Sequence, residues 1–495
     1  MVRQHARPLR RADGHGDLGG GALRADRPRR ERRGRHPGAA HRRAAGRRDS
    51  GTTRAVRREH DPQRRSGVLG APPGGRRRSL TIAYRHDLVV VGGGPAGAAT
   101  AYWAALHGLD VLVLERKQFP REKTCGDGLT PRAVKQLLDM GLGSEIESYH
   151  RFGGLRAVAH GHTRELRWPE HAIFPSHGYV VQRSILDTAV LQHAQRAGAQ
   201  LWHGAEVVEP LLADSLCRGV RVRDRATGDS SDVEATYLVV ADGANSRIGR
   251  GLGSRRERSW PQGMAIRAYY ESPNADDPWI ESALDVRDRN GATLPGYGWI
   301  FPLGDGTVNV GIGLLTSYRD WRNVNTSHLM TEWAYAAPER WGLDPAAPLA
   351  PPVGGRLPMA GSVNPKAGPN FLVVGDAAGS VNPFNGEGID YAYETGRLAA
   401  EVVAEAVICD DGLALSRYPE LLESTYGAYY KVARLFAYAI GRPRLISRLV
   451  QFGMQSQTLM EWALRIMANL MDADDPGPAE YIYKAAARAA WIWPD

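Results

Sequence analysis

Blocks of apolar and polar residues predict a mixed α/β fold beyond residue 84. The segment Asp87–Val91 is apolar on both faces, which is typical of a strand buried in a parallel sheet. A helical stretch over Ala98–His107 follows, and a second apolar run, Asp110–Glu115, comes next. The order strand, helix, strand predicts a βαβ unit with two parallel strands.

The loop between this strand and helix reads Gly92-Gly93-Gly94-Pro95-Ala96-Gly97. In such a loop the first glycine permits a tight turn and the second lets the backbone approach a pyrophosphate. The third, Gly97, lets helix and strand pack closely. Glu115 ends the second strand, where an acid commonly binds a ribose hydroxyl. The stretch therefore predicts a dinucleotide site with the pyrophosphate on the helix N-terminus, and it does not separate FAD from NAD.

Two later apolar strands also end in an acid beside small residues. Val239–Ala241 leads into Asp242-Gly243, and Asn370–Val374 leads into Gly375-Asp376. Downstream, Asn385-Gly386-Glu387-Gly388-Ile389 opens a long predicted helix. Small residues at a strand end let the backbone approach a ligand, so both loops are candidate parts of one cofactor site.

Alternation of apolar and polar positions in Trp260–Ile312 predicts a second, antiparallel domain. Tyr297, Trp299 and Phe301 alternate there, so a strand would place all three rings on one face. Such a face is either a flat apolar wall for a ligand or part of the ordinary domain core.

The last stretch, Leu413–Leu470, mixes arginine with large apolar residues and predicts helices. The helices within Tyr429–Met471 would either lie on an anionic bilayer or form a packed cap with a solvated basic face.

The net charge of +9 comes from the beginning of the chain. Residues 1–80 hold 23 Arg, no Lys and 7 acidic residues, so the rest of the chain is acidic. This composition lacks the apolar surface needed for a core, and we expect the stretch to be disordered. It is either a basic arm or the translation of a region upstream of the true start. Because the body is acidic, the sequence does not support nucleic-acid binding.

Cys125, Cys217 and Cys409 are far apart and odd in number, and they show neither a CxxC metal site nor a disulfide framework, which fits a reducing cytoplasm. The histidines show no metal-ligand spacing, so we expect no metal. No apolar run reaches the roughly 18 residues of a membrane span. We expect a cytoplasmic protein that is peripheral on the inner face of the cell membrane.

The glycine-rich loop, Asp242-Gly243 and Gly375-Asp376 together resemble the FAD-dependent oxidoreductases of the para-hydroxybenzoate hydroxylase fold. That resemblance implies bound FAD. The acid matching Asp376 contacts its ribityl–pyrophosphate part, and the arginine matching Arg183 also reaches it. Gly388 and Ile389 begin a helix whose positive N-terminus faces the flavin and stabilises its reduced, anionic form.

Two further stretches resemble the geranylgeranyl reductase family, most closely its actinobacterial menaquinone reductase branch. Thr124–Ala133 is similar to that family's Pro-Cys-Gly-Gly-Gly loop beside the flavin, with Thr124 in place of proline and Asp127 in place of glycine. Pro295–Pro302, followed by Asn309–Gly313, matches its Tyr-x-Trp-x-Phe-Pro … Gly-x-Gly pattern, which lines a prenyl cavity.

The resemblance implies reduction of a prenyl C=C bond. The branch that the chain resembles most closely implies that this bond lies in one isoprene unit of the menaquinone tail. A hydride from reduced FAD would reach one carbon and a proton the other. Cys125 would position the substrate or help to deliver the proton, and Asp127 adds an ionisable group nearby. The expected catalytic residues are Cys125, Tyr297 and Trp299, and the expected substrate-binding residues are Tyr297, Trp299, Phe301 and Pro302. The expected cofactor residues are Gly92, Gly94, Pro95, Ala96, Gly97, Glu115, Arg116, Cys125, Gly126, Arg183, Val207, Asp242, Gly375, Asp376, Gly386, Gly388 and Ile389.

The resemblance also divides the chain. We expect a Rossmann-like FAD-binding domain built from residues 84–160, 183–258 and 357–411. An antiparallel-sheet substrate domain is inserted in it, from residues 161–182 and 259–356. Residues 412–495 would form a C-terminal helical region.

Other functions stay open from sequence. The substrate could instead be geranylgeranyl diphosphate or another polyprenyl lipid, and the same fold also serves FAD-dependent aromatic monooxygenases. A lipid carrier that keeps FAD as a relic is a third alternative. The printed sequence holds one dinucleotide fingerprint, so the electron donor is expected to be external: ferredoxin, NADPH or a quinol.

Overall fold

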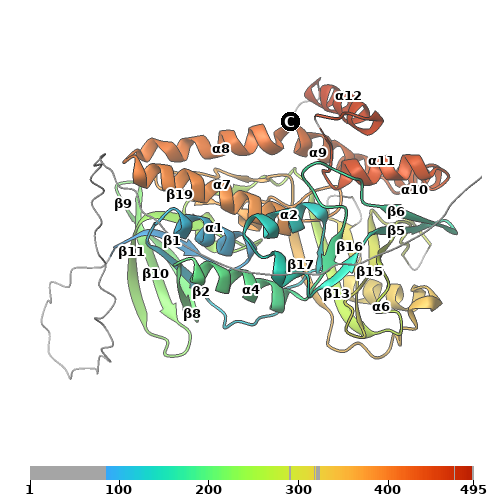
Figure 1. The fold of residues 1–495 in the computed structure, drawn as a ribbon, viewed down its shortest axis with the longest axis horizontal. Helices are drawn as coiled ribbons and strands as arrows, with labels where there is room; N and C mark the ends of the chain where they lie inside the picture. Colours follow the sequence, from blue (N-terminus) through green and yellow to red (C-terminus); the bar gives the residue numbers. More distant parts are fainter. Residues whose placement is uncertain are drawn as a thin grey trace, which may run out of the picture. The chain divides into compact units, whose positions relative to one another are not determined.

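The computed structural model describes residues 85–288, 291–316, 318, 321, 324–472 and 474–492, and every structural statement below refers to these residues (Figure 1). The predictions for residues 1–80 lie outside the described residues. The described chain forms two seven-stranded sheets, two smaller sheets and a set of helices. The predicted mixed α/β fold is confirmed.

The first large sheet contains the predicted βαβ unit. Strand β1 (Arg85–Val91) pairs in parallel with β2 (Val111–Glu115) on one side and with β11 (Ser230–Val240) on the other. The other strands are β8 (Gln200–His203), parallel to β2; β19 (Phe371–Val373), parallel to β11; and the antiparallel β10 (Leu216–Asp224) and β9 (Ala205–Ala213). Strand β2 is buried along its whole length, as a central parallel strand requires.

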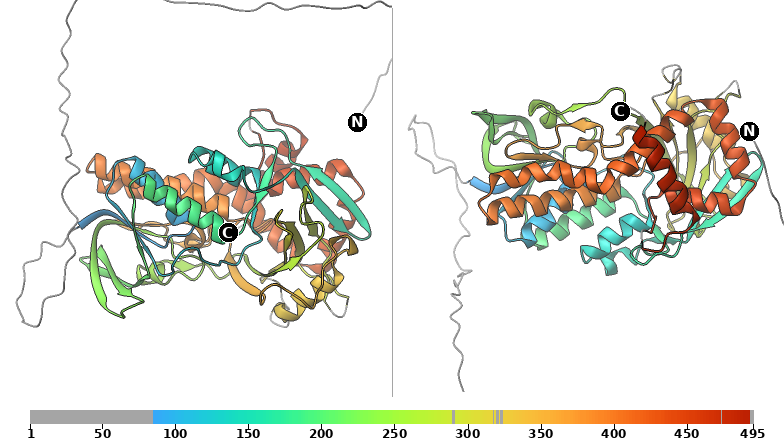
Figure 2. Two further views of the ribbon diagram at one scale, coloured as in Figure 1. Left: turned by 60° about the horizontal axis from the view of Figure 1, so that its bottom comes forward. Right: turned by 90° about the horizontal axis from the view of Figure 1, so that it is seen from above.

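Helix α1 (Pro95–Leu106) packs against α4 (Arg183–Arg196) and α7 (Ile389–Ile408), and Figure 2 shows the three helices side by side. Helix α1 begins three residues earlier than predicted because proline is favourable at the first helical position. Gly396 permits the close contact of α7 with α1, since a Cβ atom there would lie 2.5 Å from the carbonyl oxygen of Ala96.

The second large sheet is antiparallel apart from one pair. Its order is β17 (Val353–Pro358), β13 (Gln262–Glu271), β16 (Thr307–Leu315), β15 (Gly296–Pro302), β14 (Trp279–Ala283), β5 (Gly154–Ala159) and β6 (His162–Arg167). Strand β5 pairs in parallel with β14. The segment boundary expected at residue 161 therefore falls inside the β5–β6 hairpin, and β5 belongs with the second sheet. No local pattern reveals this, because the pairing partner lies far along the chain.

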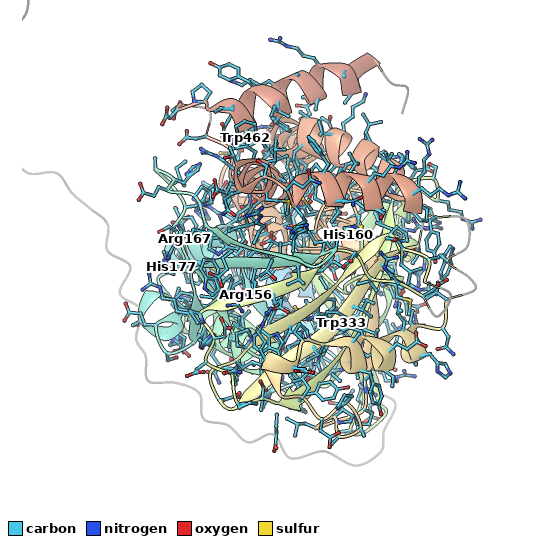
Figure 3. All side chains as sticks on the ribbon, turned by 90° about the vertical axis from the view of Figure 1, so that its right-hand side faces the viewer. Arg156, His160, Arg167, His177, Trp333 and Trp462 are labelled. Atoms are coloured by element: carbon cyan, nitrogen blue, oxygen red, sulfur yellow. The ribbon has the colours of Figure 1, made fainter. Side chains whose placement is uncertain are left out.

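The second sheet has two different faces. Helix α6 (Thr326–Ala336) covers one of them, and Figure 3 shows its Trp333 beside the strands. Trp333 packs on Gly298 of β15, where a Cβ atom would lie 2.5 Å from the indole ring. Residues of β15 that flank Gly298, including Tyr297 and Trp299, lie on the opposite face. That face forms part of the site described below.

The remaining elements are short, apart from the C-terminal helices. They are β3 (Gly128–Leu129), α2 (Pro131–Asp139), α3 (Gly143–Ile146), β4 (His150–Phe152), β7 (Gly178–Val180), α5 (Arg247–Gly251), β12 (Arg255–Arg256), η2 (Glu339–Trp341), β18 (Val363–Asn364) and η3 (Gly375–Ala378). The predicted C-terminal helical region comprises η4 (Gly412–Ser416), α8 (Arg417–Leu422), η5 (Glu423–Gly427), α9 (Ala428–Ile440), α10 (Pro443–Gly453), α11 (Gln457–Met467) and α12 (Pro478–Ile492). Among the described helices, none is long and apolar enough to span a bilayer.

Candidate functional site

A cavity of about 990 Å³ runs through the described body and brings the predicted motifs together. The cavity is lined by the glycine-rich loop, the Cys125 loop, strand β15, the Asn385–Ile389 loop and helices α9 to α11. Of the predicted residues, it is lined by Gly92, Gly94, Pro95, Ala96, Glu115, Arg116, Cys125, Gly126, Arg183, Val207, Asp242, Tyr297, Trp299, Phe301, Asp376, Gly386, Gly388 and Ile389. Gly97, Gly375 and Pro302 are not among the lining residues.

Gly97 acts on the site through packing. A Cβ atom there would lie 1.8 Å from the carbonyl oxygen of Gly92 and 3.3 Å from the Cβ atom of Ala241. Gly92 itself has a φ of +102°, a conformation that other residues rarely adopt. These glycines therefore let the start of α1 approach the ends of β1 and β11, as the sequence predicted.

Glu115 holds the glycine-rich loop from the next strand. Its Oε2 atom accepts a hydrogen bond from the backbone N–H of Gly93 at 2.8 Å, and Oε1 accepts one from Lys117 N–H at 2.9 Å. Each carboxylate oxygen can accept a second bond. A role as acceptor for a ribose hydroxyl, as the sequence suggested, remains compatible with this arrangement.

The nucleotide end of the cavity offers what a dinucleotide needs. The N-terminus of α1 has no side-chain cap, so its free N–H groups and positive end remain available to a pyrophosphate. Gly94, the residue before α1, lines the cavity without a side chain to obstruct it. Asp242 has a buried Oδ1 atom without a hydrogen-bond partner, and burial raises its pKa. An uncapped helix and an unpartnered acceptor fit FAD, which brings a phosphate group and hydroxyl donors.

Arg183 connects helix α4 to the Cys125 loop. Its guanidinium forms two hydrogen bonds with the buried carboxylate of Asp187, at 2.8 and 2.9 Å, and its positive charge acts on the Cys125 thiol. Arg121 approaches the same carboxylate at 3.1 Å. Burial raises the pKa of Cys125, while the positive charge of Arg183 opposes the rise.

Asp127 is fully buried beneath this loop and does not line the cavity. Its Oδ2 atom accepts hydrogen bonds from the Tyr269 hydroxyl at 2.5 Å and from Asn309 Nδ2 at 2.7 Å, while Oδ1 has no partner. Burial raises the pKa of Asp127 to about 6, although both hydrogen bonds oppose the rise. Its carboxylate therefore braces the loop from behind.

The three alternating rings of β15 face the Cys125 loop. A Cβ atom on Gly126 would lie 3.2 Å from Phe301 and 3.3 Å from Trp299 Nε1. The prediction that Tyr297, Trp299 and Phe301 share one face is confirmed, with successive ring centroids 5.9 and 6.2 Å apart. Gly311 makes room for this wall, because a Cβ atom there would lie 2.1 Å from the indole of Trp299.

Across the cavity, the Asn385–Ile389 loop carries an acid whose importance the sequence did not indicate. Glu387 lines the cavity and accepts a hydrogen bond from the Thr130 hydroxyl. The Tyr297 hydroxyl donates to the backbone carbonyl of Asn385, which ties the aromatic wall to this loop. The sequence singles out this loop for its glycines, and only the fold brings Thr130 to Glu387.

The far end of the cavity is apolar. It is lined by side chains of α9, α10 and α11: Phe436, Ile440, Ile446, Leu449, Val450, Leu459, Met460, Ala463, Leu464 and Met467. Leu449 is also 47% exposed at the protein surface, so α10 borders the mouth of the cavity. The sequence predicted helices here, and it could not place them against the cavity.

Comparison with known proteins agrees with this geometry. Residues 85–348 match the model of a family described as FAD binding domain. The menaquinone reductase of Mycolicibacterium smegmatis is 42% identical over 408 residues, which cover 82% of this chain and 97% of that protein. The chain belongs to the geranylgeranyl reductase family of FAD-dependent oxidoreductases. It is thus a flavoenzyme, and its cofactor is FAD.

Two further proteins are similar to this chain. The digeranylgeranylglycerophospholipid reductase 2 of Methanosphaera stadtmanae is 33% identical over 70% of this chain and 85% of that protein. Among solved structures, a geranylgeranyl bacteriochlorophyll reductase-like protein from Thermoplasma acidophilum has the same fold, with a TM-score of 0.66. At 22% identity it covers 78% of this chain and 98% of the other.

Proposed function

We propose that this enzyme saturates one C=C bond in the prenyl chain of a lipid, and that the lipid is menaquinone. The observation that carries the proposal is the course of the cavity. It leads from the N-terminus of α1, past Cys125 and the aromatic wall, to an apolar end beneath α10 and α11. The first part suits a dinucleotide, and the last part suits an isoprenoid tail.

Reduced FAD, when bound, supplies a hydride to such a bond. The residues of the chain supply the conditions for it. An isolated alkene is a poor hydride acceptor, so it must be held dry and in contact with its reaction partner. Tyr297, Trp299 and Phe301 provide an apolar wall of tilted rings, and the Cys125 loop packs against it. We assign Cys125 to positioning the alkene, because it lines the cavity in the loop that packs against this wall.

The apolar end suits a prenyl tail, because the side chains that line the cavity from α9 to α11 are apolar. The choice of menaquinone over geranylgeranyl diphosphate is supported by the similarity to proteins named menaquinone reductase. An aromatic monooxygenase acting on a small substrate would leave this end without a role.

Helix α10 gives the protein a surface suited to a bilayer. Leu445, Leu449 and Phe452 are exposed on it, and Phe452 is 64% exposed. Arg444 and Arg448 are exposed on the same helix. Apolar side chains beside arginines are typical of helices that lie in the interface of an anionic membrane. Because α10 borders the cavity, we infer that the lipid tail enters from the membrane along this helix.

The test is reduction of menaquinone by the purified, FAD-loaded enzyme in anionic vesicles, with FAD reduced chemically beforehand. We expect menaquinone to gain two hydrogen atoms in its tail, detected by mass spectrometry, and geranylgeranyl diphosphate to be left unchanged. If the enzyme reduces geranylgeranyl diphosphate and leaves menaquinone unchanged, the substrate is a prenyl lipid other than menaquinone. Oxygen consumption with hydroxylation of an aromatic would overturn the proposal.

The same preparation identifies the electron donor. Ferredoxin, NADPH and a quinol remain the candidates. Each is added without oxygen to the enzyme with oxidised FAD, and bleaching of the flavin absorbance reports reduction. The physiological donor should reduce the flavin faster than menaquinone is consumed.

A further inference from the structure

Three carboxyl groups gather beside the cavity around a single guanidinium. Glu387 precedes α7, and Asp390 and Glu394 lie on its first two turns. Arg132 of α2 contacts Glu394 Oε1 at 2.8 Å and lies 3.8 Å from Asp390 Oδ2. Asp390 is fully buried, and neither of its carboxyl oxygens has a hydrogen-bond partner.

The cluster cannot be fully ionised at low cost. One guanidinium carries one positive charge and cannot neutralise three carboxylates, and buried unpaired charge is strongly unfavourable. Glu394 has the close contact with Arg132, together with a hydrogen bond from the Tyr426 hydroxyl at 2.7 Å. The protons therefore reside on Asp390 and Glu387. Of these two, only Glu387 lines the cavity.

The surroundings of Glu387 hold its carboxyl group in place. The Thr130 hydroxyl donates to Oε1, and Asn385 Nδ2 donates to Oε2 at 3.3 Å. The ionisable groups that face Glu387 come from four elements and the Cys125 loop: Arg132 on α2, Asp390 and Glu394 on α7, Tyr297 on β15, Tyr429 on α9, and Cys125. Burial, with Glu394 nearby, raises the pKa of Glu387 to about 7.

Other groups near the aromatic wall are worse placed to give up a proton. The Tyr297 hydroxyl donates to Asn385, and burial raises its pKa. Asp127 is buried beneath the Cys125 loop and does not line the cavity. The Cys125 thiol has a pKa raised by burial, so it is a weaker acid than a carboxyl group.

We propose that Glu387 is the general acid of the reaction, and that its carboxyl proton goes to the alkene carbon that does not receive the hydride. This inference rests on the proposed prenyl reduction. The C=C bond takes a hydride, with its electron pair, from reduced FAD at one carbon. The O–H bond of Glu387 breaks as a C–H bond forms at the other carbon. The saturated unit leaves, and the carboxylate regains a proton from water.

The first experiment compares Glu387→Gln with Glu401→Gln, a control on the exposed side of α7. The glutamine side chain can still accept the hydrogen bond from Thr130, so flavin content should match the wild type, and thermal stability should fall only by the long contact with Asn385 Nδ2 at 3.3 Å. With menaquinone in vesicles and pre-reduced enzyme, we expect Glu387→Gln to slow single turnover at least about a hundredfold. Glu401→Gln should react at the wild-type rate.

The second variant, Thr130→Val, tests the role of Glu387 without removing its carboxyl group. Thr130 makes no side-chain cap to α2, so the change leaves the helix start intact. Its hydroxyl lowers the pKa of Glu387, and its loss should raise that pKa. Wild-type turnover should fall as pH rises through about 7, and the same fall should occur at higher pH in Thr130→Val.

Infrared difference spectra give a readout that is independent of turnover. The wild type should show the carbonyl stretch of a protonated carboxyl group that disappears as pH rises past neutrality, and Glu387→Gln should lack that band. If wild type reduces menaquinone and Glu387→Gln does so at a similar rate, Glu387 is not the acid. An unchanged pH profile in Thr130→Val would also overturn the proposal. If the wild type reduces no prenyl lipid, the proposed function fails instead.

Discussion

The indole Nε1 of Trp299 donates a hydrogen bond to Oδ1 of Asn309 at 2.9 Å, which fixes the central ring of the aromatic wall. The amide nitrogen of Asn309 in turn donates to the backbone carbonyl of Cys125 at 2.9 Å and to the carboxylate of Asp127. One buried amide thus sets the distance between the wall on β15 and the Cys125 loop. Only an amide both accepts and donates in this way.

Replacing Asn309 should therefore loosen both sides of the site. In Asn309→Ala, Trp299, Cys125 and Asp127 each lose a buried hydrogen bond, and each loss costs about 1 kcal/mol or more. We expect urea unfolding to show a total loss of about 3 kcal/mol. Gln195→Ala, which removes an exposed amide on α4, should lose less than about 0.5 kcal/mol. Equal losses in the two variants would show that Asn309 does not brace the wall.

Asp127 should make stability depend on pH. Its pKa is raised from 3.8 to about 6 in the folded protein, so folding favours its protonated form. The stabilisation is complete at pH values below the pKa of Asp127 in the unfolded chain. The free energy of unfolding then falls by a total of about 3 kcal/mol as the pH rises through about 6. The measurement is urea unfolding of wild type and Asp127→Asn from pH 4 to 7. The free energy of unfolding of the variant should rise relative to that of the wild type as the pH rises. A difference in unfolding free energy that stays constant with pH would contradict the prediction.

The parts of the fold that the sequence predicted depend on local signals. The βαβ unit is fixed by buried strands and by the glycines that separate them, and the aromatic wall follows from alternation alone. The Glu387 cluster was not predicted because Arg132 comes from a helix far earlier in the chain. The network of Asp127 was hidden for the same reason, since Tyr269 and Asn309 lie on two strands of the second sheet. Contacts between distant segments carry no periodic signature.

Gly97 offers a direct test of the cofactor loop. In Gly97→Ala the new methyl group would meet the carbonyl oxygen of Gly92 at 1.8 Å, so α1 must move away from β1. We expect a loss of stability of at least about 3 kcal/mol and protein without flavin absorbance. Gly412→Ala is the matched control, because nothing lies within 4 Å of a Cβ atom there. Full flavin content in Gly97→Ala would show that the close approach is not required.

Cys125 should affect turnover and leave cofactor binding intact. Removing its thiol in Cys125→Ala leaves Arg183 paired with Asp187, so the loop and the flavin content should persist. Loss of a positioning group at the wall should lower turnover of menaquinone at least about tenfold. Cys409→Ala, at an exposed thiol, should match the wild type. Unchanged turnover in Cys125→Ala would remove this cysteine from the mechanism.

Helix α10 should control membrane binding. Replacing both Leu449 and Phe452 by aspartate removes apolar surface that would enter the bilayer and adds charge that anionic lipids repel. In sedimentation with anionic vesicles, we expect binding to fall at least about tenfold, while flavin content stays at the wild-type level. Leu413→Asp changes a side chain on η4 that is 78% exposed and should bind as the wild type does. Because Arg444 and Arg448 contribute charge, wild-type binding should weaken as salt rises. Equal binding of all three proteins would exclude α10 as the membrane contact.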